Sequence, residues 1–120
     1  MAELVAIVPL DSLIEQLGLN QVDFIKADIE GYEMEMIRGA YETIKKFRPV
    51  ILLEMDDTFL RKAGSSLKNL WCIMLEFELI PYDIDGKELP KEVPLTTDGD
   101  ILWVPREKLE HFKTSASSSL

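Results

Sequence analysis

Three carboxylates surround a glycine in the first third of the chain. Asp28, Glu30 and Glu33 flank Gly31, and they follow a short apolar run over residues 22–27. A run of that length is typical of a buried strand, and a carboxylate just after such a strand can take a proton from a substrate or bind a cation. Asp28 and Glu30 are therefore candidates for chemistry. Glu33 is explained by the stabilisation that an acid gives to the start of a helix.

The elements around these acids predict where they lie. After Gly31 the apolar residues recur at helical spacing: Met36, Ile37, Ala40, Tyr41 and Ile44. Residues 50–55 are again almost wholly apolar, the pattern of a strand covered on both faces in a parallel sheet. Strand, helix and strand form a right-handed crossover. Glu54 then lies on the same rim as Asp28, where ligands collect in open α/β sheets.

The segments that flank this unit complete the predicted fold. Residues 4–10 form an apolar run, predicted as a strand that ends before Pro9. Asp11 or Ser12 is predicted to cap a short helix that ends at Gly18, and Ser12 with Glu15 matches a capping box. Ser65 or Ser66 is predicted to begin another helix, in which Cys72 is expected to be buried.

Two further strands are predicted over residues 77–83 and 100–105, and the turn at Asp85 and Gly86 makes them antiparallel. The predicted fold class is α/β, with a mixed, mostly parallel sheet that ends in an antiparallel hairpin and with helices packed on the sheet.

Composition narrows the class of protein. The 120 residues are enough for one domain, predicted over residues 1–113, and the serine-rich residues 114–120 are predicted to be disordered. A net charge of -9 argues against binding to nucleic acid. No signal peptide or membrane span is predicted, and a single cysteine cannot form an internal disulfide, so we expect a cytoplasmic protein.

Three spaced segments resemble one family. Residues 23–33 (DFIKADIEGYE), 37–40 (IRGA) and 48–54 (RPVILLE) are similar to consecutive segments of the FkbM-type S-adenosylmethionine-dependent methyltransferases. Residues 9–13 (PLDSL) resemble an earlier segment of that family, with Pro9 in place of threonine. The likeness runs from about Val8 to Val104, and the order and spacing of the segments make it more specific than any one of them.

The resemblance implies a Rossmann-like methyltransferase fold, with S-adenosylmethionine near Asp28 and Ile29. It implies transfer of a methyl group to a hydroxyl of a small molecule or sugar, with Asp28 as the base or as a metal-orienting carboxylate and with Glu30 and Glu54 in support. The complete family domain begins with strands that carry a glycine-rich loop, and this sequence contains no such loop. Only the carboxyl-terminal half of the fold is represented.

Two functions therefore stay open. The chain is either a methyltransferase domain or a non-catalytic remnant that serves as a dimerisation or partner-binding module. In the complete fold the strand over residues 22–27 lies beside a strand that this sequence lacks. An uncovered edge on an apolar strand favours pairing. Either residues 4–8 fold over this edge or two chains join through it, and of these a homodimer is the preferred prediction.

Overall fold

A computed structural model describes residues 9–94 and 99–110. The expected strand over residues 4–8 and the expected disordered tail lie outside these ranges. The described elements are α1 (Leu10–Leu17), β1 (Phe24–Ala27), α2 (Glu33–Gly39), α3 (Tyr41–Phe47), β2 (Val50–Glu54), α4 (Asp57–Lys62), α5 (Leu67–Glu76), β3 (Leu79–Tyr82), β4 (Asp100–Pro105) and a short 3-10 helix, η1 (Arg106–Lys108).

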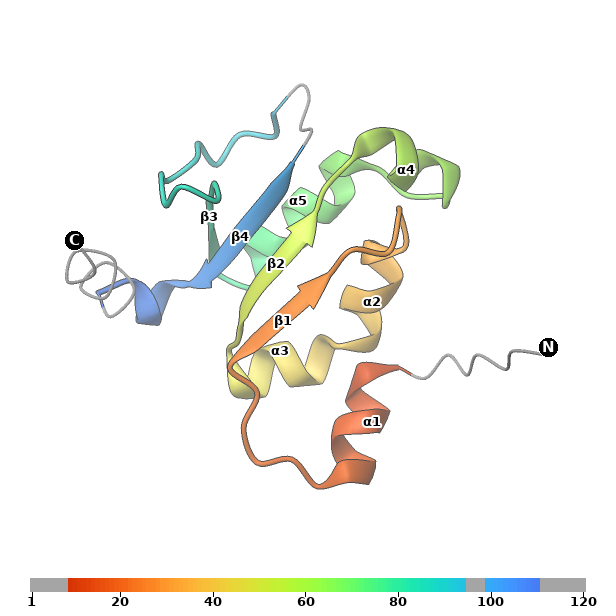
Figure 1. The fold of residues 1–120 in the computed structure, drawn as a ribbon, viewed down its shortest axis with the longest axis vertical. Coiled ribbons are helices and arrows are strands. Elements are labelled where there is room, and N and C mark those ends of the chain that lie inside the picture. The colour runs from red at the N-terminus through yellow and green to blue at the C-terminus, as the bar shows by residue number, and fades with distance from the viewer. Residues whose placement is uncertain (1–8, 95–98, 111–120) are drawn as a thin grey trace.

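The four strands form one mixed sheet in the order β1-β2-β4-β3 (Figure 1). β1 and β2 are parallel, and β4 is antiparallel to both of its neighbours. The α/β class and the antiparallel pairing of β3 with β4 are confirmed. The prediction of a mostly parallel sheet is wrong: only the pair β1 and β2 is parallel among the described strands, because the reversed strand β4 lies inside the sheet and not at its end. Pro81 explains the edge position of β3, since a proline cannot donate a backbone hydrogen bond to a second neighbouring strand.

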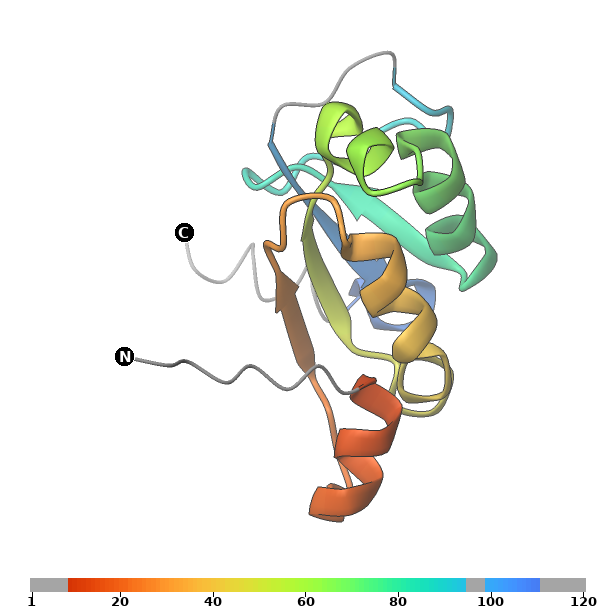
Figure 2. The same cartoon turned by 90° about the vertical axis from the view of Figure 1, so that its right-hand side faces the viewer.

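Helices α2 to α5 pack on one face of the sheet (Figures 1 and 2). The core between these layers holds Ile51 and Leu53 of β2, and Trp71 and Trp103 meet edge to face with ring centroids 4.9 Å apart. On the opposite face, Val104 is buried in a smaller cluster with residues of β3. No helix among the described elements covers that second face in Figure 2.

The predicted strand over residues 22–27 is confirmed, because β1 falls within it. The prediction that this strand is buried is wrong: only Ala27 is buried, and Phe24 is 53% exposed. The edge position of β1 explains the difference, since one side of the strand has no neighbour in the described sheet. Cys72 is also exposed, contrary to expectation, although Ser66 caps its helix as predicted.

The capping box predicted for α1 is not formed. The helix begins at Leu10 with Pro9 at its cap position and no side-chain cap, while its predicted end at Gly18 is confirmed by a left-handed φ of 65°. Asp11 instead reaches across to α3, where its carboxylate accepts hydrogen bonds from the backbone amides of Glu42 and Thr43 at 3.0 and 2.8 Å. This contact joins α1 to the first turn of α3, whose orphan amides need an acceptor.

The single helix predicted after Gly31 is divided in two at Ala40, which adopts a φ of -111°. Gly39 packs closely against the start of α1, since a methyl group there would lie 3.3 Å from the Cα and Cβ of Pro9. Arg48 ends α3 in a left-handed conformation, and its guanidinium binds the carboxylate of Glu107. After this turn the chain enters β2, which runs parallel to β1.

Candidate active site at the carboxyl ends of β1 and β2

The turn between β1 and α2 is held by a buried carboxylate. Glu33 is 1% exposed, and its two oxygens accept hydrogen bonds from the backbone amides of Ile29 and Gly31, both at 2.9 Å. Glu30, between them, has a φ of 50°, and Gly31 has a φ of 104°. A backbone that turns this sharply leaves amide groups without partners, and Glu33 supplies the acceptors.

The same turn is pressed against α4. A methyl group placed on Gly31 would come within 2.1 Å of the carbonyl oxygen of Phe59, so only glycine fits. α4 is itself fixed at its start, because the carboxylate of Asp56 accepts hydrogen bonds from Thr58 and Phe59. The position of the acidic turn is therefore set from both sides, by Glu33 within the turn and by α4 outside it.

Asp28 and Glu54 form a hydrogen-bonded pair of carboxyl groups. The parallel register pairs Ala27 with Leu53, so the next residues on β1 and β2 are Asp28 and Glu54. The hydrogen bond to Asp28, followed by burial and by the negative charges of Asp28, Asp100 and Glu33, raises the pKa of Glu54 from 4.5 to about 7. Two neighbouring carboxylates resist full ionisation, so Glu54 retains its proton to a higher pH than an isolated glutamate does.

A third strand brings another acid to this rim. Asp100 begins β4 and lies opposite Glu54 in the antiparallel register. Its negative charge is one of the causes that raise the pKa of Glu54. Among the described residues, no group of three or more His, Cys, Asp or Glu side chains is arranged to hold a metal ion.

The structure brings together two of the three predicted catalytic residues. Asp28 and Glu54 are paired, whereas Glu30 is exposed and, within the described part of the chain, forms no hydrogen bond with either of them. The catalytic roles of all three remain predictions. Glu33 and Asp100 were not assigned to the site from the sequence. The need for acceptors in a sharp turn could have indicated Glu33, and Asp100 required knowledge of the strand order.

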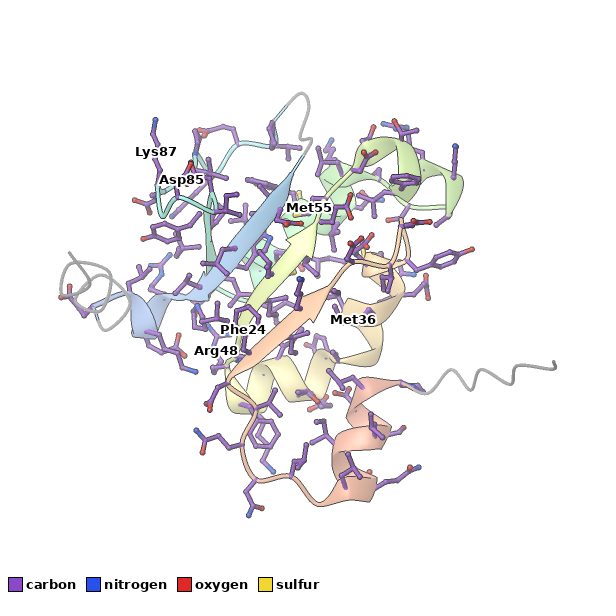
Figure 3. All side chains as sticks on the ribbon, viewed as in Figure 1. Phe24, Met36, Arg48, Met55, Asp85 and Lys87 are labelled. Atoms are coloured by element: carbon purple, nitrogen blue, oxygen red, sulfur yellow. The ribbon has the colours of Figure 1, made fainter. Side chains whose placement is uncertain are left out.

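A largely apolar cavity of about 750 Å³ lies beside β1 and adjoins the acidic turn. Its lining includes Ile25 and Ala27 of β1, Ile29 and Tyr32 of the turn, and Met36 of α2, which is labelled in Figure 3. The cavity and the neighbouring carboxylates fit the methyl-donor end of S-adenosylmethionine, since a sulfonium cation is stabilised by nearby negative charge. Ile29 lines this cavity and Asp28 does not, and the roles of both residues in binding the cofactor stay predictions.

The raised pKa of Glu54 predicts how stability depends on pH. Between about pH 4.5 and about pH 7, folded Glu54 keeps a proton that the unfolded chain has released. The free energy of unfolding should therefore fall as the pH rises through this window. Urea titrations of the wild type and of Glu54→Gln check this, because glutamine cannot titrate and should flatten the dependence. Equal slopes for the two proteins would contradict the assignment.

Comparison with known proteins shows the family to which this α/β domain belongs. The description "Methyltransferase FkbM domain" matches residues 3–77, more than half of the chain. The chain belongs to the FkbM methyltransferase family. It is 30% identical over 89 residues to the 2-O-methyltransferase NoeI of Sinorhizobium fredii (strain NBRC 101917 / NGR234), a match that spans 72% of this chain and 36% of that protein.

The chain thus spans about a third of the length of this curated relative. No solved structure matches the chain. None of the described helices has both the length and the apolar character that crossing a membrane requires.

Proposed function

We propose that this chain forms part of an S-adenosylmethionine-dependent methyltransferase that modifies a hydroxyl group of a small molecule or sugar. The observation that carries the proposal is the hydrogen-bonded pair of Asp28 and Glu54 at the ends of two parallel strands. Membership of the FkbM family supports methyl transfer, and the name of the relative NoeI, a 2-O-methyltransferase, supports oxygen as the acceptor atom.

The carboxyl pair suits the proton chemistry of such a reaction. A hydroxyl group must lose its proton as its oxygen takes a methyl group, and a base is most effective when its pKa lies near the working pH. Asp28, the proposed base, can take the proton of the acceptor hydroxyl when Glu54 is ionised, and Glu54, with its pKa raised to about 7, can then hold that proton. Glu33 keeps Asp28 in place, because it fixes the turn that follows Asp28.

S-adenosylmethionine would supply an electrophilic methyl group at this rim. Asp28 and Ile29 would contact it, and the cavity beside β1 would shield it from water. We further propose that residues 1–113 act as one domain without a glycine-rich cofactor loop, and that the protein is cytoplasmic. Binding of the cofactor by this chain alone should then be weak.

Two measurements on the purified chain test the proposal. Calorimetric titration with S-adenosylmethionine should show no micromolar affinity, because the usual glycine-rich loop is absent from the sequence. At saturating S-adenosylmethionine carrying a labelled methyl group, label should pass to sugars and other polyols but not to the same compounds with their hydroxyls blocked. Transfer to nitrogen or sulfur acceptors alone would reject an oxygen methyltransferase.

A second function is favoured by a separate feature, the open edge of β1. In the described sheet this strand pairs only with β2, and an apolar cavity lies along its other side. We propose a non-catalytic role in dimerisation or partner binding as the alternative. A folded chain that associates but shows no methyl transfer at any donor concentration would favour it.

A further inference from the structure

β1 presents an apolar strand edge, and the direction of its backbone groups follows from one hydrogen bond. The amide of Val50 donates to the carbonyl of Asp23 at 3.0 Å. Backbone groups alternate in direction along a strand, so those of Ile25 and Ala27 also point towards β2. The amide and carbonyl groups of Phe24 and Lys26 therefore point away from β2, towards the open edge.

The side chains at this edge are also unusual for an exposed strand. Phe24, labelled in Figure 3, is 53% exposed, and Ile25 lines the cavity of about 750 Å³. Natural proteins protect such edges with short strands, charges or a covering segment, because a flat apolar edge templates further pairing. Lys26 is the one charged residue within β1, and it lies two positions from Phe24 on the same face of the strand.

We infer that β1 pairs with β1 of a second copy of this chain, antiparallel and centred on Ile25. A two-fold axis normal to the sheet keeps each face continuous, so only registers centred on a residue are allowed. Centring on Ile25 places Lys26 of each copy opposite Phe24 of the other copy. The outward backbone groups then face one another, as in the hydrogen-bonded pairs of an antiparallel ladder.

Charge complementarity selects this register over its neighbours. With Lys26 opposite Phe24, each ammonium group can lie over the face of an aromatic ring, which attracts a cation. A register centred on Lys26 would instead place two ammonium groups directly opposite, which is destabilising. A register centred on Phe24 would leave Lys26 opposite Val22, without a ring. In the register centred on Ile25, the cavities of the two copies meet across the axis. The two four-stranded sheets then form one continuous sheet.

Self-pairing does not depend on methyl transfer, so each can fail without the other. Sedimentation velocity over a range of protein concentrations should show a dimer for the full chain. Raising the salt concentration should strengthen the dimer, since each chain carries a net charge of -9 and salt screens the repulsion between copies. A wild-type chain that stays monomeric at every concentration would overturn the inference.

Lys26→Pro is the sharpest variant. Proline removes an amide that faces only the open edge, so the ladder between β1 and β2 is kept and the dimer should be lost. Lys26→Gln is the matched control, because it keeps the amide and removes only the cation; its dimer should be weaker but present. Circular dichroism should show that both variants are folded. A dimer that survives Lys26→Pro would place the interface elsewhere.

Cross-linking tests the register itself, even if Lys26→Pro does not fold. In a Cys72→Ser background, Ile25→Cys puts two thiols at directly opposed positions, with Cα atoms about 4.5 Å apart, within the range of a disulfide. Phe24→Cys puts them on a diagonal, about 7–8 Å apart and beyond that range. Oxidation should therefore link the Ile25→Cys chains far more efficiently. Preferential linking of Phe24→Cys would exclude this register.

Discussion

Asp28→Asn is expected to lower the turnover of methyl transfer on the order of 100-fold or more while the fold is kept, because general-base catalysis contributes roughly that factor. Asparagine has almost the same shape as aspartate but cannot accept a proton at neutral pH. Asp28 is exposed and lies at the end of β1, so its replacement removes no core contact. Steady-state rates with labelled S-adenosylmethionine measure the loss.

Asp23→Asn is the matched control for this variant. Asp23 precedes the same strand at its opposite end, and its carboxylate binds only the amide of Gln21 among the described side chains. The variant Asp23→Asn should leave the turnover of methyl transfer unchanged. If Asp23→Asn and Asp28→Asn lose activity equally, the effect is one of net charge and not of a base at the rim.

The pair also has a readout that does not require turnover. The hydrogen bond with Asp28 is the largest cause of the raised pKa of Glu54. The amide of asparagine can donate to ionised Glu54, so Asp28→Asn should bring the pKa of Glu54 down towards 4.5. Carbon-13 NMR of the Glu54 carboxyl group follows this shift. An unchanged pKa would show that Asp28 and Glu54 do not act as a pair.

The parts of the fold that could be predicted are those that depend on local patterns of residue types. Two apolar runs separated by a helical period predicted the parallel pair β1 and β2, and with it the meeting of Asp28 and Glu54 on one rim. Ser66 and Gly18 were predicted as helix boundaries because their chemistry is local. In each case the signal lies within a few residues of the feature that it predicts.

Features that depend on distant contacts were missed. Asp11 caps α3, which begins about thirty positions further along the chain, and does not cap α1. Its position at the expected start of α1 was therefore misleading. The insertion of β4 between β2 and β3 decides which acid lies opposite Glu54, and no local pattern specifies that order. The exposure of Phe24 likewise follows from the edge position of β1 and not from its apolar sequence.

Gly31→Ala is expected to destabilise the chain by about 3 kcal/mol or more, a large share of the stability of a small domain. Two costs add. A φ of 104° is unfavourable for any residue with a Cβ, and that Cβ would lie 2.1 Å from the carbonyl oxygen of Phe59. Because the obstacle is backbone, it cannot rotate away, so either the turn or α4 must move.

Gly86→Ala separates these two costs. Gly86 has a similar φ of 86°, but no atom lies within 4 Å of the position that its Cβ would take. It should lose only about 1 kcal/mol, the cost of the left-handed conformation itself. Urea unfolding of both variants gives the difference, which measures the contact with Phe59. Equal losses would mean that the turn is free to shift away from α4. Asp28 would then be held beside Glu54 by the ladder of β1 and β2 alone, without support from α4.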